Sequence, residues 1–294
     1  MSKLIQNRYE FVYLFDVENG NPNGDPDAGN MPRIDPETNH GIVTDVCLKR
    51  KVRNYFQILG KDGYDIFIKQ RIPLNPLIAE ACEETKLETY KKKDGKWDTD
   101  QAKKRSQKDI ETMQKWLCSK YFDIRAFGGV LSTGPNAGQI RGPIQLSFAR
   151  SIDPIIPLEV TITRVTDVDK EEGEMGRKHV VPYALYRGEG YISAHFAQQT
   201  EFSEDDLKLF WEALINMFEH DHSSARGKMS ARKLIIFKHQ TALGNAPAHL
   251  LFDAIEVKNK VNLDEGEPVR KFQDYKIEVN NDVIPSEVEM IEML

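Results

Sequence analysis

The hydrophobic positions of the chain repeat with two periods, the two-residue period of strands and the 3.6-residue period of helices. Alternating apolar and polar residues, or runs rich in β-branched and aromatic ones, predict strands at residues 9–16, 64–71, 142–150, 158–165, 180–186, 190–196, 234–237 and 250–257. Apolar residues at three- and four-residue steps predict helices at residues 41–56, 75–89, 106–121 and 203–218. Reduced to its core, the order is strand, helix, strands, helix, strand. That order predicts an α+β sandwich of the RNA-recognition (ferredoxin-like) type.

The first predicted helix has two faces. Thr44 or Asp45 can cap its N-terminus, and an apolar stripe follows at Leu48, Val52, Tyr55 and Leu59. The opposite face gathers cations, with no acidic residue before Asp62; these are Lys49, Arg50 and Arg53, beside Gln57. Cations on the outer face of an amphipathic helix are usually just solvated. The helix alone is therefore compatible with either a solvated face or a polyanion-binding face.

A long polar loop, residues 18–30, separates the first strand from this helix. It consists almost wholly of Asn, Gly, Pro and Asp, which favour turns and stop a strand. Compact domains usually join elements in about four to six residues, so this loop is either functional or disordered. Asn19, Asn21 and Thr44, with backbone N–H groups near the helix start, can supply neutral donors to phosphates.

The charge of the chain is unevenly distributed. The net charge of the 294 residues is −6, and residues 252–294 alone hold 11 Asp and Glu against 5 Lys and Arg, so the rest sums to zero. Elsewhere cations cluster, at residues 49–53 and at Lys91, Lys92, Lys93, Lys96, Lys103, Lys104, Arg105 and Lys108. A local basic surface can bind phosphate whatever the global sum, so the acidic total does not exclude nucleic acid.

Composition excludes other classes of protein. No run approaches the roughly 18 apolar residues of a membrane helix, and the first ten residues lack the apolar block of a signal peptide, so we expect a cytoplasmic protein without a membrane partner. Cys47, Cys82 and Cys118 have no metal-ligand spacing, which favours reduced thiols.

Three segments together carry a family resemblance: residues 41–56, residues 123–128 running on to 142–152, and residues 176–186. With the strand at residues 11–16 they span most of residues 9–237. The chain resembles the backbone subunit of a type I CRISPR surveillance complex (Cascade), most closely the type I-C version, in the superfamily of repeat-associated RNA-binding proteins.

The resemblance implies a right-hand shape. It implies a palm of RNA-recognition fold, a helical finger insertion and a hairpin thumb, with these boundaries: 1–59 palm with the basic helix, 60–138 finger, 139–166 palm strands, 167–190 thumb, and 191–294 palm completion with an acidic tail. It also implies a non-catalytic protein that needs no cofactor or metal ion. Copies of it would line one guide RNA (crRNA), leave it free to pair with target DNA, and meet a large subunit, a small subunit and a crRNA-end-binding subunit.

By this likeness the cationic helix face becomes a contact for the guide backbone. A guide held without reading its sequence is contacted at phosphates and sugars, so Lys and Arg are the expected residues. The implied thumb carries side chains suited to backbone and base faces, although a plain surface hairpin would carry them equally well: Arg177, Lys178, His179, Tyr183 and Arg187. Arg226 and Lys228, in the basic turn at residues 223–228, complete the candidate RNA-binding residues, although this turn lacks the glycine-rich loop of many superfamily members.

Two other functions compete with this interpretation. RNA-cleaving relatives carry an Asp before the first helix, and Asp25, Asp27 or Asp35 with His40 would make the chain a metal-independent endoribonuclease. A protein-only scaffold would tolerate neutralisation of the basic groups. His220-Asp221-His222 suggests a metal site, but no further ligand cluster is evident, so we expect a solvated helix end there.

Overall fold

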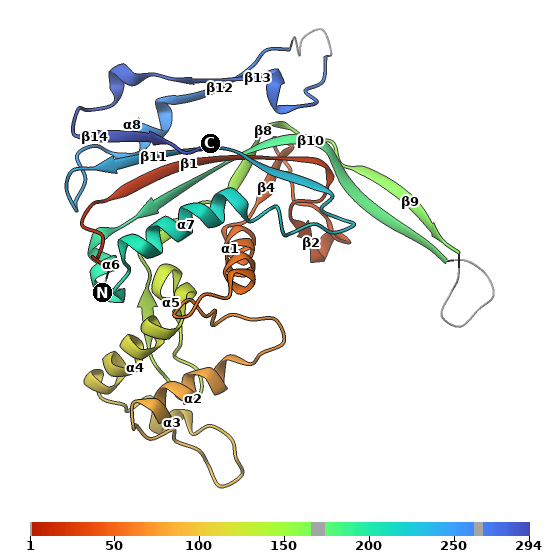
Figure 1. Cartoon of the computed structure of the whole chain (residues 1–294). Coiled ribbons are helices and arrows are strands. Elements are labelled where there is room, and N and C mark those ends of the chain that lie inside the picture. Colours follow the sequence, from red (N-terminus) through yellow and green to blue (C-terminus); the bar gives the residue numbers. More distant parts are fainter. Residues whose placement is uncertain (1, 166–173, 262–266) are drawn as a thin grey trace.

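The chain folds around an antiparallel sheet whose central strand is the predicted first strand (Figure 1). The computed structural model describes residues 2–165, 174–261 and 267–294. β1 (Tyr9–Gly20) pairs with β10 (Glu174–Ile192) on one side and β11 (Lys228–His239) on the other. The full order is β14-β11-β1-β10-β8-β4, in which the outer strands are β14 (Val288–Glu292), β8 (Ala149–Pro154) and β4 (His40–Val43). The short β7 (Ile144–Leu146) pairs with the end of β10.

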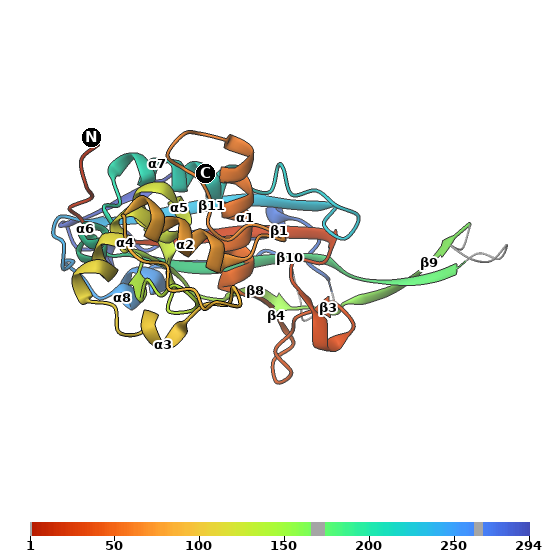
Figure 2. The same ribbon diagram turned by 90° about the horizontal axis from the view of Figure 1, so that it is seen from below.

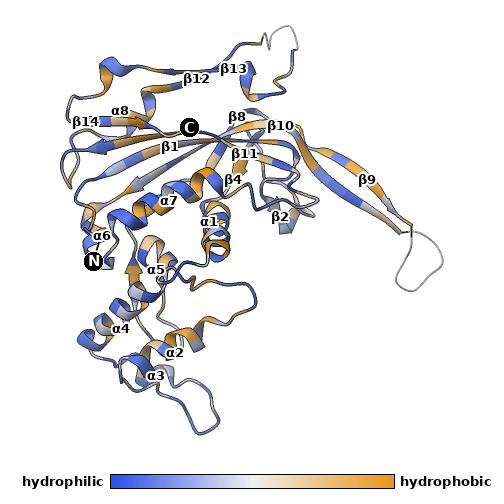
Figure 3. Cartoon of the chain, in the orientation of Figure 1, coloured by the Kyte–Doolittle hydropathy of each residue, from blue (hydrophilic) through white to orange (hydrophobic). Residues whose placement is uncertain are grey.

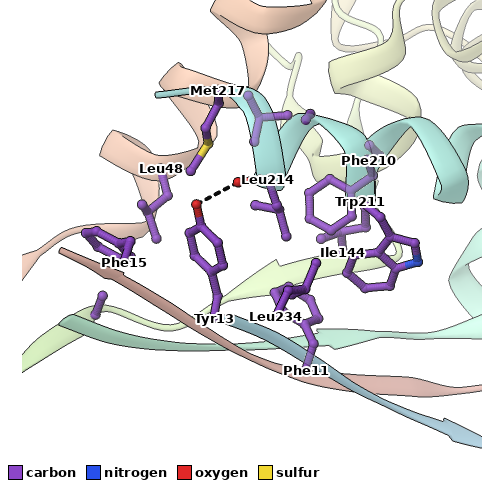
Figure 4. Close-up of a cluster of buried hydrophobic side chains, with 14 of the residues drawn as sticks. Phe11, Tyr13, Phe15, Leu48, Ile144, Phe210, Trp211, Leu214, Met217 and Leu234 are labelled. Carbon is purple, nitrogen blue, oxygen red and sulfur yellow. Dashed lines mark hydrogen bonds between the residues drawn. The ribbon is translucent and has the colours of Figure 1, made fainter. Parts of the chain in front are cut away.

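Two helices cover one face of this sheet, as the sequence predicts. α1 (Asp45–Leu59) follows β4, and α7 (Glu204–Asn216) precedes β11 behind a capping box formed by Ser203 and Asp206. Phe11, Tyr13 and Phe15 point from β1 toward them, and the Tyr13 hydroxyl donates to the Leu214 carbonyl at 2.6 Å (Figure 4). The strand order β11-β1-β10-β8 with helices after β1 and before β11 confirms the α+β, RNA-recognition-type fold.

The opposite face of the sheet is covered by the acidic C-terminal part of the chain. α8 (Ala248–Asp253), β12 (Ile255–Asn259) and β13 (Tyr275–Val279) pack there, with short 3-10 turns at Phe272–Asp274 and Asn281–Val283. Figure 1 shows them as a separate layer (blue) on this side. The prediction of a strand over residues 250–257 is wrong, because Pro247 starts a helix there before the chain turns extended.

The finger insertion is a small helical unit with its own core. It contains α2 (Leu74–Glu84), α3 (Thr99–Ala102), α4 (Gln107–Lys120), α5 (Phe122–Phe127), β5 (Gly128–Val130) and β6 (Gln139–Arg141). Phe67, Met113 and Leu117 are among its buried side chains. The predicted strand at residues 64–71 is reduced to one bridge from Asp65 to Tyr121. Residues 134–137 are buried in this unit, where the Asn136 side chain donates to the Ala102 carbonyl at 3.0 Å.

A two-stranded arm projects from the palm (Figures 1 and 2). It consists of β9 (Leu158–Arg164) and the first part of β10. Residues 158–164, predicted as palm, therefore belong to the arm, and residues 166–173 of the predicted palm end and thumb lie outside the described residues. β10 continues without a turn through Arg187, so the predicted break between residues 180–186 and 190–196 is wrong; α6 (Ala194–Thr200) follows it.

Among the described residues the longest helix is α1, with 15 residues, and no helix has the length and apolar character needed to cross a bilayer.

Candidate nucleic-acid interface

The N-terminus of α1 is fixed to the polar loop that precedes it. Thr44 caps the helix by accepting from the Cys47 N–H at 3.4 Å. Its own N–H and hydroxyl both donate to the Asn23 side-chain oxygen, at 3.0 and 2.9 Å. The loop is thus built into the palm, with a small hairpin of β2 (Gly24–Asp25) and β3 (Met31–Pro32) around a 3-10 turn at Pro26–Ala28.

The same loop reaches the basic turn at residues 223–228. The Asn21 N–H donates to the Ala225 carbonyl at 2.6 Å, and the Asn21 amide donates to the Asn30 carbonyl at 2.7 Å. Asn19 stands exposed beside them with a φ of 50°. The Asn21 side-chain oxygen and Arg33 Nε are buried here without a hydrogen-bond partner in the protein. Unpartnered buried polar atoms are costly, so they indicate a place where a polar ligand or water completes the bonding.

A hollow of about 300 Å³ opens between α1, this loop and the basic turn. Polar side chains of Asn23, Thr44 and Asn54 line it together with four cations and one anion: Arg33, Arg50, Lys51 and Arg226, and Asp221. Arg33 pairs with Asp25 at 3.2 Å, whereas Arg50 donates to the Ile68 carbonyl at 2.9 Å and has no carboxylate partner in the described part of the chain. Positive charge exceeds negative charge in this hollow, which suits a phosphate-bearing ligand.

The Cys47 thiol also lines this hollow. Burial raises its pKa, and Lys51 and Arg226 oppose the rise. Its Sγ donates weakly to the Pro22 carbonyl at 3.5 Å. The raised pKa favours the protonated thiol, which is the less reactive form.

The base of the arm lies next to the basic turn. Lys178 Nζ donates to the Ser224 carbonyl at 3.3 Å, and Lys228 pairs with Glu18 at the end of β1 at 2.9 Å. Arg177 extends from the arm with 74% of its side chain exposed and pairs with Glu159 at 3.0 Å. His179 lies two residues along β10, on the same face of the arm as Arg177. The structure thus brings together two groups of predicted residues that are far apart in sequence.

The predicted cationic face of α1 needs correction. Lys49 pairs with Asp45 at 2.9 Å and has only 12% of its side chain exposed. Arg53 is buried, and its Nε donates to Asp123 at 2.8 Å. The buried stripe also differs, since Phe56 is buried while Leu59 is 39% exposed. Of the three predicted cations, Arg50 alone lines the hollow.

Two predicted arm residues lie on the opposite face of the sheet. The Tyr183 hydroxyl donates to Asp16 at 3.0 Å, and burial raises the pKa of that carboxyl. Arg187 donates to the carbonyls of Ile255 and Phe252 at 2.8 and 2.7 Å, beneath the C-terminal layer. Arg187 therefore fastens that layer to the sheet, whereas Tyr183 bonds within the sheet and packs beneath the layer, and neither side chain lines the hollow.

Sequence reasoning predicted Thr44, Arg50 and Arg226 as site residues but missed the other residues that line the hollow: Asn23, Arg33, Val46, Cys47, Lys51, Asn54 and Asp221. Lys51 belongs to the basic run at residues 49–53, but the 3.6-residue repeat of the helix places it between the apolar face and the predicted cationic face. Asp221, expected at a solvated helix end, is instead 12% exposed and paired with Lys51 and Arg226. No group of three or more potential metal ligands occurs in residues 2–165, 174–261 and 267–294.

Three of the four candidate nuclease residues are engaged in other contacts. Asp25 pairs with Arg33, and Asp35 pairs with Arg150 at 2.7 Å, which lowers the pKa of Asp35. The His40 Nδ1 lies 2.7 Å from the Ser151 carbonyl. Asp27 is exposed within its 3-10 turn. A carboxylate bound to an arginine is a weak base, so this arrangement does not favour acid–base catalysis.

Similarity to known proteins agrees with the fold. A "CRISPR-associated protein Cas7" of Haloferax volcanii is 25% identical over 302 residues, covering 93% of this chain and 81% of that protein. A solved chain described as "CRISPR RNA-guided surveillance complex, pre-nicking" superposes with a TM-score of 0.52 at 14% identity, covering 78% of each chain, and so shares the fold. The family model for the CRISPR-associated protein Cas7 matches residues 7–280. The chain therefore belongs to the Cas7 family of CRISPR-associated proteins.

Proposed function

We propose that the chain is a non-catalytic subunit that binds the backbone of a crRNA in the hollow at the N-terminus of α1. The observation that carries this proposal is the convergence of Arg33, Arg50, Lys51 and Arg226 on one polar hollow. These side chains come from the loop, the helix and the basic turn. Cations and backbone N–H groups at a helix start bind phosphate without reading base edges, which suits a guide that must stay available for pairing.

Further contacts extend this surface along the arm. Asn19, Asn21 and Thr44 supply neutral groups beside the hollow, and Lys49 lies on the same helix. Arg177, Lys178, His179 and Lys228 continue the cationic surface from the basic turn onto the arm. The proposed path of the guide therefore runs from the start of α1 to the base of the arm.

The wider assembly is part of the same proposal. The Haloferax relative and the similar solved chain are described by CRISPR names, and the resemblance of residues 41–56 and 176–186 points to the type I-C Cascade. On this proposal several copies line one crRNA in the cytoplasm, present it to target DNA, and meet a large subunit, a small subunit and a crRNA-end-binding subunit.

A salt titration of RNA binding tests the proposal. Replacing Arg33, Arg50 and Arg226 by Gln is expected to weaken binding about equally for unrelated RNA sequences, because phosphates carry no sequence information. The slope of log affinity against log salt should fall by about 0.7 for each lost phosphate contact on a single strand. Lys238→Gln is the control, since Lys238 pairs with Glu289 on the β11–β14 side of the sheet.

An unchanged slope in the triple variant would overturn the assignment of the hollow. Size-exclusion chromatography of the chain with RNA, followed by a gel for cleavage, separates an RNA-binding subunit from a nuclease and from a protein-only scaffold. Large assemblies with intact RNA support the proposal. A monomer that cleaves the RNA would indicate an endoribonuclease with Asp25, Asp27 and Asp35 as candidate catalytic residues. A protein that does not bind RNA would indicate a protein-only scaffold.

A further inference from the structure

Asp221 is the one acidic side chain that lines the cationic hollow of the described chain. It follows α7 and precedes the basic turn, and its carboxylate forms ion pairs with Lys51 Nζ and, at 2.9 Å, with Arg226 Nε. The carboxylate is 12% exposed, so it sits at the edge of the hollow rather than in open solvent.

The buried ammonium of Lys51 requires a counter-charge in the hollow. The Lys51 side chain is only 4% exposed, and a buried ammonium without a counter-charge is strongly unfavourable. Asp221 supplies that charge in the free protein. Arg226 has 39% of its side chain exposed, so its guanidinium can pair with either Asp221 or a ligand in the hollow. A phosphodiester offers the same single charge and the same kind of oxygen acceptors as a carboxylate.

We propose that Asp221 takes the place of a guide phosphate in the free subunit, and that the RNA backbone must displace it from Lys51 and Arg226. This inference rests on the proposed function, since it concerns the same hollow. Breaking the ion pairs of Asp221 costs free energy, and this cost lowers the net affinity of the hollow for any single phosphate. RNA that also engages Arg33, Arg50 and the arm compensates for this loss, whereas a polyanion making one or two contacts does not. Asp221 is thus a specificity-determining residue that suppresses binding of unsuitable polyanions.

The variant Asp221→Asn in the full chain tests this. Unrelated-sequence single-stranded RNA should bind on the order of tenfold tighter than to the unmodified chain. The slope of log affinity against log salt should change little, because on this proposal the RNA contacts the same phosphates in both chains. Asp27→Asn is the matched control, because it removes the same charge from the same end of the palm, and no ion pair of Asp27 occurs among the described residues.

The outcomes separate the two proposals. If the unmodified chain binds RNA in a salt-dependent way, but Asp221→Asn binds no tighter than Asp27→Asn, the role of Asp221 is overturned and the RNA-binding function stands. If the unmodified chain binds no RNA, both are overturned.

Asp221→Asn leaves the buried Lys51 without its counter-charge, so this variant alone does not separate an effect on RNA binding from a loss of folding. The same substitution is therefore also made in the variant Lys51→Gln. In the variant Lys51→Gln no buried ammonium remains, and Asp221 still holds Arg226. Adding Asp221→Asn to it should tighten RNA binding several-fold by releasing Arg226. Equal affinities of the single and double variants would contradict the proposal.

Discussion

Neighbouring arginines on α1 have different roles because different partners meet them. Arg53 is held by Asp123, whose carboxylate also accepts from the N–H groups of Phe67 and Ile68 at 2.7 and 3.1 Å. Arg50, one turn earlier, donates to the Ile68 carbonyl and to no carboxylate of the described residues. Arg53 therefore joins the palm to the finger, while Arg50 keeps most of its hydrogen-bonding capacity for a ligand.

This difference predicts opposite effects of two identical substitutions. Arg53→Gln leaves the buried Asp123 without its charge partner, and we expect it to lower the free energy of unfolding by about 3–5 kcal/mol. Arg50→Gln should change stability by less than about 1 kcal/mol and weaken RNA binding. Urea unfolding and RNA titration on both variants measure this. Equal stabilities would show that the Arg53–Asp123 pair does not hold the finger in place.

Cys47 gives a chemical probe of the hollow. Cys82 and Cys118 are buried, whereas Cys47 is partly exposed and lines the cavity. Only the thiolate reacts, and burial raises the pKa of Cys47, so its alkylation should be slow at pH 8 and accelerate as the pH rises. Bound RNA should slow the reaction, as measured by mass spectrometry. Alkylation at the same rate with and without RNA would argue against ligand binding in this hollow.

At the scale of the elements, β10 joins the palm to the arm. Its Arg-Gly-Glu-Gly segment, residues 187–190, is typical of a turn, but in the structure it is part of the strand. The two glycines allow side chains of neighbouring strands to pack directly against the backbone. A Cβ on Gly190 would come within 2.1 Å of the Phe11 ring, and one on Gly188 would meet the Ala149 Cβ at 3.3 Å. The strand therefore runs straight through the core and out into the arm.

The arm has few contacts that stabilise the palm. Leu158, Val160 and Ile162 are 48%, 43% and 41% exposed along one face of β9 (Figure 3). Apolar residues in such a row usually mark an interaction surface. We therefore expect the arm to contact a partner in the assembly.

Shortening the arm should prevent ordered assembly on RNA without changing the folding of the monomer. Replacing residues 161–177 by a short glycine-containing turn is expected to leave monomer unfolding unchanged, because none of the described residues in this range belongs to the buried core. Ordered assembly on RNA should be lost. Melting temperature and size-exclusion chromatography with RNA report the two effects. Normal assemblies from the shortened chain would show that the arm has another role.

At the scale of the whole molecule, the acidic C-terminal part is a structural layer. Val12, Leu14 and Leu185 point to this face of the sheet and pack with Leu251 and Phe252. Arg187 adds hydrogen bonds to it through the Ile255 and Phe252 carbonyls. The sheet face on which RNA-recognition domains stack bases is consequently covered. The proposed RNA contacts lie instead at the end of the palm, at the start of α1.

Leu251→Ala tests the structural role of this layer. Leu251 is fully buried, so the substitution should cost about 2–5 kcal/mol in the free energy of unfolding. RNA affinity of the folded fraction should stay unchanged, because the hollow lies on the other side of the sheet. The exposed Leu243→Ala is the control. A negligible loss of stability would mean that the layer is only loosely attached.

The sequence by itself determined the order of the elements and the class of fold. The period of the apolar residues in β1, α1, α4 and α7 depends on local geometry, and the caps at Thr44, Ser106 and Ser203 lie next to the helices they start. Such signals act over a few residues, so they can be read without knowing the fold. The cluster of cations at residues 49–53 likewise pointed to the end of the palm where the hollow lies.

Only the tertiary structure decided which charges are available to a ligand. Asp123 is 70 residues from Arg53, and Asp221 is 170 residues from Lys51. Tyr183 and Arg187 are turned to the covered face by the register of β10 against β1. Whether a charged side chain is solvated or paired depends on partners that the fold brings from far along the chain, and no local pattern records them.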